Sequence, residues 1–166
     1  MIGIISDTHE NEAAMQKAAH LFKERKVDFV VHCGDIVSPP VLDNFKGLKM
    51  KLVFGNNDGE KAGLNKKAKE LGFEEVSEEK EFIYERKRFY VYHGTIKAKL
   101  DSAIQSGKYD YVLTGHTHIK RDEKIGKTRV INPGALFRAN PYTIAVLDAA
   151  KDELEFVEIN RQSDNK

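Results

Sequence analysis

The chain has 166 residues, enough for one domain that can bury about 70% of the surface exposed by its unfolded form. Its 27 lysine and arginine residues nearly balance 26 aspartate and glutamate residues, which excludes strong nonspecific nucleic-acid binding through charge alone. The single cysteine, Cys33, excludes an internal disulfide. With no apolar run of roughly 20 residues and no evident secretory signal, we expect a soluble, cytoplasmic protein without a membrane partner.

The first half of the chain alternates strands and helices. Short apolar runs predict the strands, and apolar residues recurring at helical spacing predict the helices. In chain order we expect a strand at 2–6, a helix at about 11–25, a strand at 27–33, a strand at 51–54 and a helix at about 59–71.

The starts of two helices in this half are marked by capping residues. Ser38 followed by Pro39 predicts a short helix with proline in its first turn, lying between the second and third strands. Asp58 is expected to cap the helix that follows the third strand.

The second half contains mainly strands. A charged turn joins two apolar runs into a hairpin at about 82–92. Its aromatic face could pack in the core or against a second copy of the chain, so the sequence allows a homo-oligomer. We expect strands at 81–84, 89–92, 109–114, 121–125, 127–131, 143–147 and 154–159, a helix at about 96–106 and a turn at 132–135.

The expected architecture is two packed sheets with helices outside, parallel in the first half and largely antiparallel in the second. One domain would cover 1–160, followed by a frayed tail at 161–166.

The stretch Gly115-His116-Thr117-His118 directly follows one of the predicted strands. Both histidines therefore lie where a strand ends, which is where α/β sheets place their chemistry. Their rings can reach neighbouring positions, and Gly115 lets the backbone closely approach whatever they hold. Alone, the pair fits hydrogen-bonded loop residues as well as a metal site.

Further polar residues follow other predicted strands, and together they suit a metal centre. Carboxylate, imidazole and amide ligands fit Mn, Fe, Co, Ni or Zn better than Ca or Mg, and the absence of paired cysteines argues against structural zinc. Seven ligands are too many for one ion, whereas a shared carboxylate allows two ions about 3.5–4 Å apart. The candidates are Asp7, His9, Asp35, Asn56, His93, His116 and His118.

In chain order these residues form the motifs Asp-x-His, Gly-Asp, Gly-Asn-x-Asp, His-Gly and Gly-His-x-His. This order resembles the calcineurin-like metallophosphoesterase superfamily over about residues 2–148. The segments 55–58 and 132–134 look most similar to its small phosphodiesterases of the YfcE type. The resemblance implies a four-layered α/β/β/α sandwich of two mixed sheets with flanking helices.

The resemblance also implies a function and residue roles. The protein would be a phosphoric diester hydrolase that cleaves a small phosphodiester with a hydroxide activated by two divalent ions. Mn²⁺ or Ni²⁺ is expected first, with Fe²⁺, Co²⁺ or Zn²⁺ as alternatives. Asp7, His9 and His118 would hold one ion, and Asn56, His93 and His116 the other, with Asp35 bridging both; His116, Asp35 and Asn56 are the catalytic candidates.

One position departs from the family pattern. Many members have histidine directly after the asparagine ligand, where it assists the leaving group, but here the residue is Asn57. An amide cannot act as an acid, so diesters with good leaving groups should react best. Asn57, Asn132 and Arg138 are candidate substrate contacts, although a turn or surface role is open for each.

Two other functions are compatible with this fold. The retromer subunit built on it is an interaction scaffold, and a nuclease could share the metal site. The complete ligand set favours an enzyme over a scaffold, and the chain has no room for a sizeable cap with which nucleases grip a polymer. Asp7 and Asp35 could instead have a purely structural role as helix N-caps.

Overall fold

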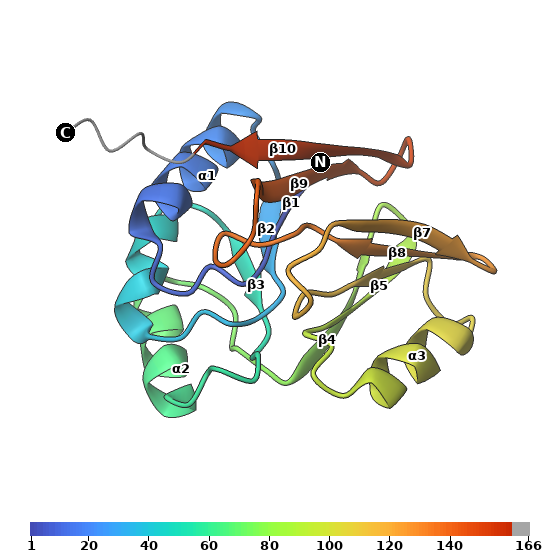
Figure 1. Ribbon diagram of the computed structural model, residues 1–166, viewed down its shortest axis with the longest axis horizontal. Helices are drawn as coiled ribbons and strands as arrows, with labels where there is room; N and C mark the ends of the chain where they lie inside the picture. The colour runs from blue at the N-terminus through green and yellow to red at the C-terminus, as the bar shows by residue number, and fades with distance from the viewer. Residues whose placement is uncertain (161–166) are drawn as a thin grey trace.

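Two five-stranded mixed sheets pack face to face in the computed structural model, which describes residues 1–160 (Figure 1). The tail predicted at 161–166 lies outside the described residues. In spatial order the first sheet contains β10 (Glu153–Ile159), β9 (Tyr142–Asp148), β1 (Ile2–Ile5), β2 (Phe29–His32) and β3 (Met50–Leu52). The second contains β4 (Glu79–Tyr84), β5 (Lys87–Tyr92), β6 (Tyr111–Leu113), β8 (Thr128–Asn132) and β7 (Arg121–Ile125).

Helices cover the outer face of each sheet, which gives the four layers expected of an α/β/β/α sandwich. The first sheet carries α1 (Glu12–Glu24), the 3-10 helix η1 (Pro39–Phe45) and α2 (Lys61–Glu70), and the second carries α3 (Lys97–Gln105) (Figure 1). Three apolar clusters separate the layers, one under each set of helices and one between the sheets. No helix in the described chain is both long and apolar enough to cross a membrane.

Parallel pairing of β1 with β2 and of β2 with β3 brings the carboxyl ends of these strands to one edge of the first sheet. In the second sheet, β5, β6 and β8 also run parallel to one another, and only β4 and β7 at the sheet edges pair antiparallel. The second half of the chain is nevertheless largely antiparallel, as expected, because β9 also pairs antiparallel with β1 and β10 with β9. The parallel strands β5 and β6 are an exception because α3 connects them as a crossover, and crossovers join parallel strands.

The short helix beginning at Pro39 is a 3-10 helix with Ser38 at its N-cap position. The Ser38 side chain makes no capping bond and donates instead to the Glu10 carboxylate at 3.0 Å. Pro39 and Pro40 lack backbone N–H groups, so few donors remain for a capping side chain. The Val41 N–H instead bonds the Ser38 carbonyl at 3.2 Å.

The aromatic hairpin β4–β5 contributes its apolar side chains to this chain's own core. Phe89 is fully buried between the sheets and stacks on Phe82 and Tyr111, with ring centroids 4.9 and 4.7 Å away. Ile83, also on β4, is 72% exposed. The hairpin aromatics therefore need no second copy of the chain to cover them, and a homo-oligomer stays a prediction.

Replacing Phe89 with alanine should lower the free energy of unfolding by about 3–5 kcal/mol, because it leaves a cavity where two stacked rings lose their shared partner. Ile83→Ala on the adjacent strand is the matched control and should change it by no more than about 0.5 kcal/mol. Urea denaturation of both variants measures the difference. Equal losses in the two variants would contradict the assignment of Phe89 to the inter-sheet core.

Candidate metal centre

Asp7 and Asp35 lie in adjacent loops after the parallel strands β1 and β2. Backbone hydrogen bonds join the loops: the Asp7 N–H donates to the Gly34 carbonyl at 3.0 Å and the His9 N–H to the Asp35 carbonyl at 3.1 Å. Asp7 is 0% exposed and Asp35 is 2% exposed. The sheet thus brings two carboxylates together in a buried position.

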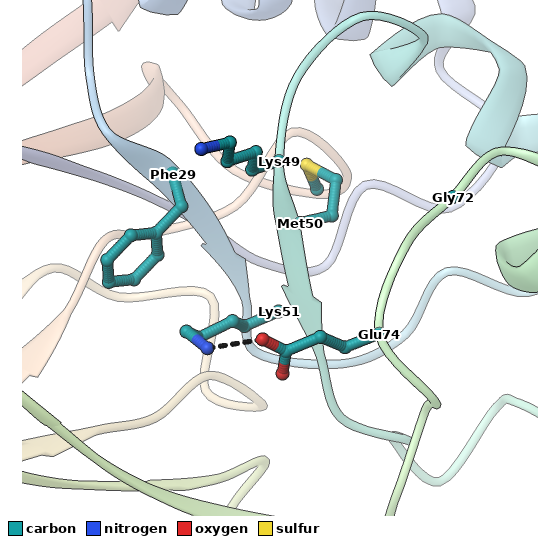
Figure 2. Close-up of a pocket in the computed structure, with 6 residues that line it drawn as sticks. All are labelled: Phe29, Lys49, Met50, Lys51, Gly72 and Glu74. Carbon is teal, nitrogen blue, oxygen red and sulfur yellow. Dashed lines mark hydrogen bonds and ion pairs between the residues drawn. The ribbon is translucent and has the colours of Figure 1, made fainter.

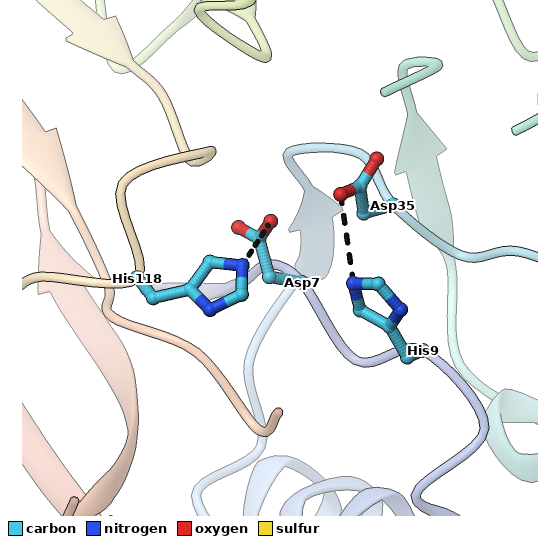
Figure 3. Close-up of side chains that lie close together, drawn as sticks. All are labelled: Asp7, His9, Asp35 and His118. Carbon is cyan, nitrogen blue, oxygen red and sulfur yellow. Dashed lines mark ion pairs between the residues drawn. The ribbon is translucent and has the colours of Figure 1, made fainter. Parts of the chain in front are cut away.

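The first group of predicted ligands surrounds these carboxylates. His118 Nε2 lies 3.2 Å from Asp7 Oδ1, and His9 Nε2 lies 3.5 Å from Asp35 Oδ2 (Figure 3). The ligand atoms of these four residues all lie within 4.8 Å of one another. This spacing allows one ion to contact all four.

The second group adjoins the first through Asp35. His93 Nε2 lies 3.5 Å from Asp35 Oδ1 and 3.0 Å from Asn56 Oδ1. His116 Nδ1 also lies 3.0 Å from Asn56 Oδ1. Asp35 therefore directs one oxygen toward each group, and the structure brings all seven predicted ligands together.

Several polar atoms in this centre lack partners that a cation would supply. Among the described residues, Asp7 Oδ1 and His9 Nε2 are buried without a hydrogen-bond partner. His93 Nδ1 donates to the Cys33 carbonyl at 2.7 Å, so in the neutral ring Nε2 presents a lone pair to the Asn56 oxygen. Buried acceptors that face one another are costly without a donor or cation. The donor set therefore fits borderline divalent ions.

The two carboxylates differ in electrostatic environment. Burial raises the pKa of Asp7 above its ordinary value and outweighs the opposing effects of His93 and the Ser6 hydroxyl, which donates to Asp7 Oδ2 at 2.6 Å. Burial would also raise the pKa of Asp35, but the His9 ring and two Asn57 donors outweigh it and hold that pKa well below its usual range. Asp35 therefore stays ionised at neutral pH.

Five of the seven predicted ligands adopt left-handed backbone conformations. Their φ angles are 51° at Asp7, 44° at His9, 61° at Asp35, 72° at His116 and 63° at His118. Such angles are uncommon outside glycine, although Asp and His tolerate them better than most residues. Each costs on the order of 1–3 kcal/mol, so the surrounding structure must hold these loops in place.

Two glycines allow other loops to lie against the carboxylates. A Cβ on Gly115 would lie 2.0 Å from Ser6 Oγ and 2.7 Å from Asp7 Oδ2. A Cβ on Gly55 would lie 2.1 Å from Asp35 Oδ1. Gly115 therefore lets the histidine loop lie against the loop that carries Asp7, and its close approach to a group held by the histidines stays a prediction.

A buried histidine outside the predicted ligand set links the loops after β1 and β2. The Gly34 N–H donates to His32 Nδ1 at 3.1 Å, so the proton lies on Nε2, which donates to Thr8 Oγ1 at 3.0 Å. Burial lowers the pKa of His32 to about 3, so the ring stays neutral. The sequence identified His32 only as a strand residue, because both of its partners lie outside its own strand.

Asp58 is not the cap of α2, contrary to expectation. The N-cap position is Glu60, whose side chain makes no capping bond. The Asp58 carboxylate is 2% exposed and accepts backbone N–H bonds from Asp35 at 3.0 Å, Gly55 at 2.7 Å and Val37 at 2.6 Å. Asp58 therefore fixes the loops that carry Asp35 and Asn56, because binding these amides satisfies a buried carboxylate better than one exposed helix end.

Comparison with known proteins agrees with this geometry. Residues 1–152 match the family model of the calcineurin-like phosphoesterase superfamily domain. The chain belongs to this superfamily. It is 37% identical over 159 residues to phosphodiesterase MJ0936 of Methanocaldococcus jannaschii, covering 92% of this chain and 95% of that protein.

Solved structures also resemble this phosphoesterase. A structure described as a novel archaeal phosphodiesterase superposes with a TM-score of 0.88 at 34% identity, covering 95% of this chain and 98% of that one. The phosphoesterase YfcE from E. coli has a TM-score of 0.69 at 20% identity, covering 96% and 99%, and supports the fold. The resemblance inferred from the ordered motifs and the four-layered architecture are thereby confirmed.

Two of the predicted substrate contacts hold parts of the phosphoesterase centre. The Asn57 side-chain amide donates to Asp35 Oδ2 at 2.8 Å. The buried Asn132 amide donates to the Gly115 carbonyl at 2.9 Å and to Thr117 Oγ1 at 3.1 Å, and so supports the loop that carries the paired histidines. Their contact with substrate remains a prediction.

Arg138 lies on the rim next to a residue that the sequence did not indicate. Its guanidinium carbon is 5.0 Å from the centre of the Phe137 ring, which in turn stacks on the His9 ring at 3.9 Å. Phe137 thus covers one ligand of the centre. No local pattern could have identified it, because the contact joins distant parts of the chain.

A hollow of about 320 Å³ lies away from the metal centre (Figure 2). Phe29 and Met50 line it from the first residues of β2 and β3, at the opposite ends of these strands from the metal loops. Lys51 and Glu74 in its wall form an ion pair at 2.5 Å. The hollow therefore carries no ligand set comparable with the metal centre.

Replacing Asp58 with asparagine should weaken Mn²⁺ binding by about tenfold or more, because an amide nitrogen would face a backbone N–H and loosen the Asp35 loop. Calorimetric titration of the metal-free protein measures the affinity. Asp43→Asn, on the exposed side of η1, is the matched control and should bind like the wild type. Unchanged affinity in a folded Asp58 variant would show that these three hydrogen bonds do not position the ligands.

Proposed function

We propose that this phosphoesterase is a phosphodiesterase that uses two divalent metal ions. The observation that supports the proposal best is the position of Asp35, whose two oxygens lie 3.5 Å from His9 and 3.5 Å from His93 in adjoining ligand groups. The relative MJ0936, named a phosphodiesterase, supports the same reaction class. One ion would be held by Asp7, His9, Asp35 and His118, and the other by Asp35, Asn56, His93 and His116.

The charge of the ligand set suits a phosphate ester. Two divalent ions would bring four positive charges against the two negative charges of Asp7 and Asp35, so the centre would attract an anionic diester. When bound, the ions would lower the pKa of a water molecule and stabilise charge on the phosphoryl oxygens. Mn²⁺ or Ni²⁺ is proposed first because imidazole nitrogens and one amide accompany the carboxylates.

The side chains around the ions would orient the phosphate group. His116 is exposed on the rim and its Nδ1 faces Asn56, so a bound phosphoryl group would meet this ring first. The Asn57 amide, which donates to Asp35, would keep that carboxylate turned between the two ligand groups. His116, Asp35 and Asn56 are the proposed catalytic residues.

The first test is restoration of activity by metal. Protein stripped with a chelator should be inactive and should hydrolyse bis(4-nitrophenyl) phosphate, in preference to the monoester, after Mn²⁺ or Ni²⁺ is added. His116→Ala should lower kcat/KM by at least about 100-fold, because a ligand at the substrate rim is lost. His20→Ala, on the exposed face of α1, should retain wild-type activity.

The opposite result would favour a different function. If folded protein binds Mn²⁺ but hydrolyses neither substrate with any divalent ion, the phosphodiesterase proposal fails. The fold would then act as an interaction scaffold.

A second test concerns the leaving group. Asn57→His should leave turnover of an activated aryl diester within about threefold and should raise or maintain turnover of a methyl 4-nitrobenzyl diester, because imidazole can protonate a poor alkoxide leaving group. Paired kinetics on the two substrates measure the effect, and Asn57→Gln controls for side-chain size. A selective loss on the alkyl diester would refute the idea that a missing acid limits this enzyme.

A further inference from the structure

A hollow of about 400 Å³ adjoins the metal centre on the side of His118. The loop after β6 contributes His118, Ile119 and Lys120 to its wall, and the loop before β9 contributes Arg138 and Pro141. His118 belongs to both the hollow and the ligand group. A molecule whose phosphate reaches the centre can therefore extend directly into this space.

The hollow presents two cations without paired anions. Neither Arg138 nor Lys120 forms an ion pair with any residue in the described chain. Their charges lie over aromatic rings instead, Arg138 at 5.0 Å from Phe137 and Lys120 at 5.4 Å from Phe156. By contrast, Arg129 on the neighbouring strand β8 pairs with two aspartates. Two uncompensated cations beside one hollow favour an anionic ligand.

The same hollow has an apolar wall. Ile119, which is 70% exposed, and Pro141 both line it. The volume is at the lower end of the range for small-molecule sites and admits a nucleotide-sized fragment. The wall therefore suits a ligand with both a ring and a negative charge.

We propose that this hollow is a specificity subsite that binds a second phosphate group, carried on one ester substituent of the phosphodiester substrate. The inference rests on the proposed function, because it assumes that the scissile phosphate lies at the metal centre. Arg138 and Lys120 bind the second phosphate, and Ile119 and Pro141 contact the ring or sugar between the two phosphates. The substrate class is then a nucleotide-like diester with an additional phosphate.

Two chromogenic substrates that differ only in the second phosphate test the proposal. They are thymidine 5′-(4-nitrophenyl phosphate) and the same compound with a 3′-phosphate, assayed with the Mn²⁺-loaded full chain. The 3′-phosphate should raise kcat/KM by about tenfold, mainly through KM, and added salt should reduce the advantage. Arg138→Ala and Lys120→Ala should each remove most of the advantage, measured within each variant as the ratio of kcat/KM for the two substrates.

Two matched controls separate loss of the subsite from a general change in charge. Arg86 is an exposed arginine in the turn between β4 and β5, with φ 59° close to the 46° of Arg138. Arg86→Ala therefore removes the same charge from a similar backbone conformation. Lys66→Ala on α2 matches Lys120→Ala. Both controls should retain the full advantage of the 3′-phosphate.

Binding provides a readout that does not depend on turnover. By calorimetry, thymidine 3′,5′-bisphosphate should bind the Mn²⁺-loaded protein about tenfold more tightly than thymidine 5′-phosphate, and Arg138→Ala should abolish the difference. Equal affinities, or a preference that persists in both subsite variants, would overturn the proposal. Failure of the proposed function gives a different result from failure of the subsite proposal. In the first case bis(4-nitrophenyl) phosphate would not be hydrolysed, but the relative affinities of the two thymidine phosphates would still test the subsite.

Discussion

The structure around the centre depends on one constraint, two buried carboxylates that lie next to each other without a lysine or arginine partner among the described residues. Within the described chain, the ion pairs of Asp7 and Asp35 involve only histidines, and no lysine or arginine compensates them. Burying like charges in this way is costly unless hydrogen bonds and cations offset it. The hydrogen bonds come from the chain: the Ser6 hydroxyl and the His116 N–H bind Asp7 Oδ2 at 2.6 and 3.0 Å. The remaining demand for positive charge favours the binding of a metal ion here.

Holding these carboxylates in place requires strained loops on a rigid support. The parallel strands β1 and β2 bring the loops together, and five of the predicted ligands have left-handed backbone conformations. Asp58 and His32 then fix the loop backbone with buried hydrogen bonds. The strain is concentrated where the chemistry is proposed, and the regular sheets stabilise it.

The sequence predicted the features that depend on local pattern. Apolar runs located the strands, and because parallel strands end at the same edge of a sheet, polar residues after separate strands could be expected to meet. Local pattern did not predict how certain distant segments pack against one another. Strand direction in the second sheet depends on the α3 crossover, and the stacking of Phe137 on His9 depends on how two loops fold together. Asp58 resembled a helix cap because it precedes α2, whereas its three partners lie in other loops or across the turn.

The division between ligands and rim indicates where substrate preference would arise. The predicted ligands lie close to one another around Asp7 and Asp35, so changes among them would alter metal binding before they altered selectivity. The hollow is lined by exposed side chains that are not predicted ligands, among them Ile119, Lys120 and Arg138, while the loops that carry them are held by Asn132 and by the stacking of Phe137 on His9. If the proposed subsite exists, such a hollow would discriminate between ester substituents without altering the metal ligands. By this argument, a common metal centre would supply the chemistry, and the hollow beside His118 would determine which diester this protein hydrolyses.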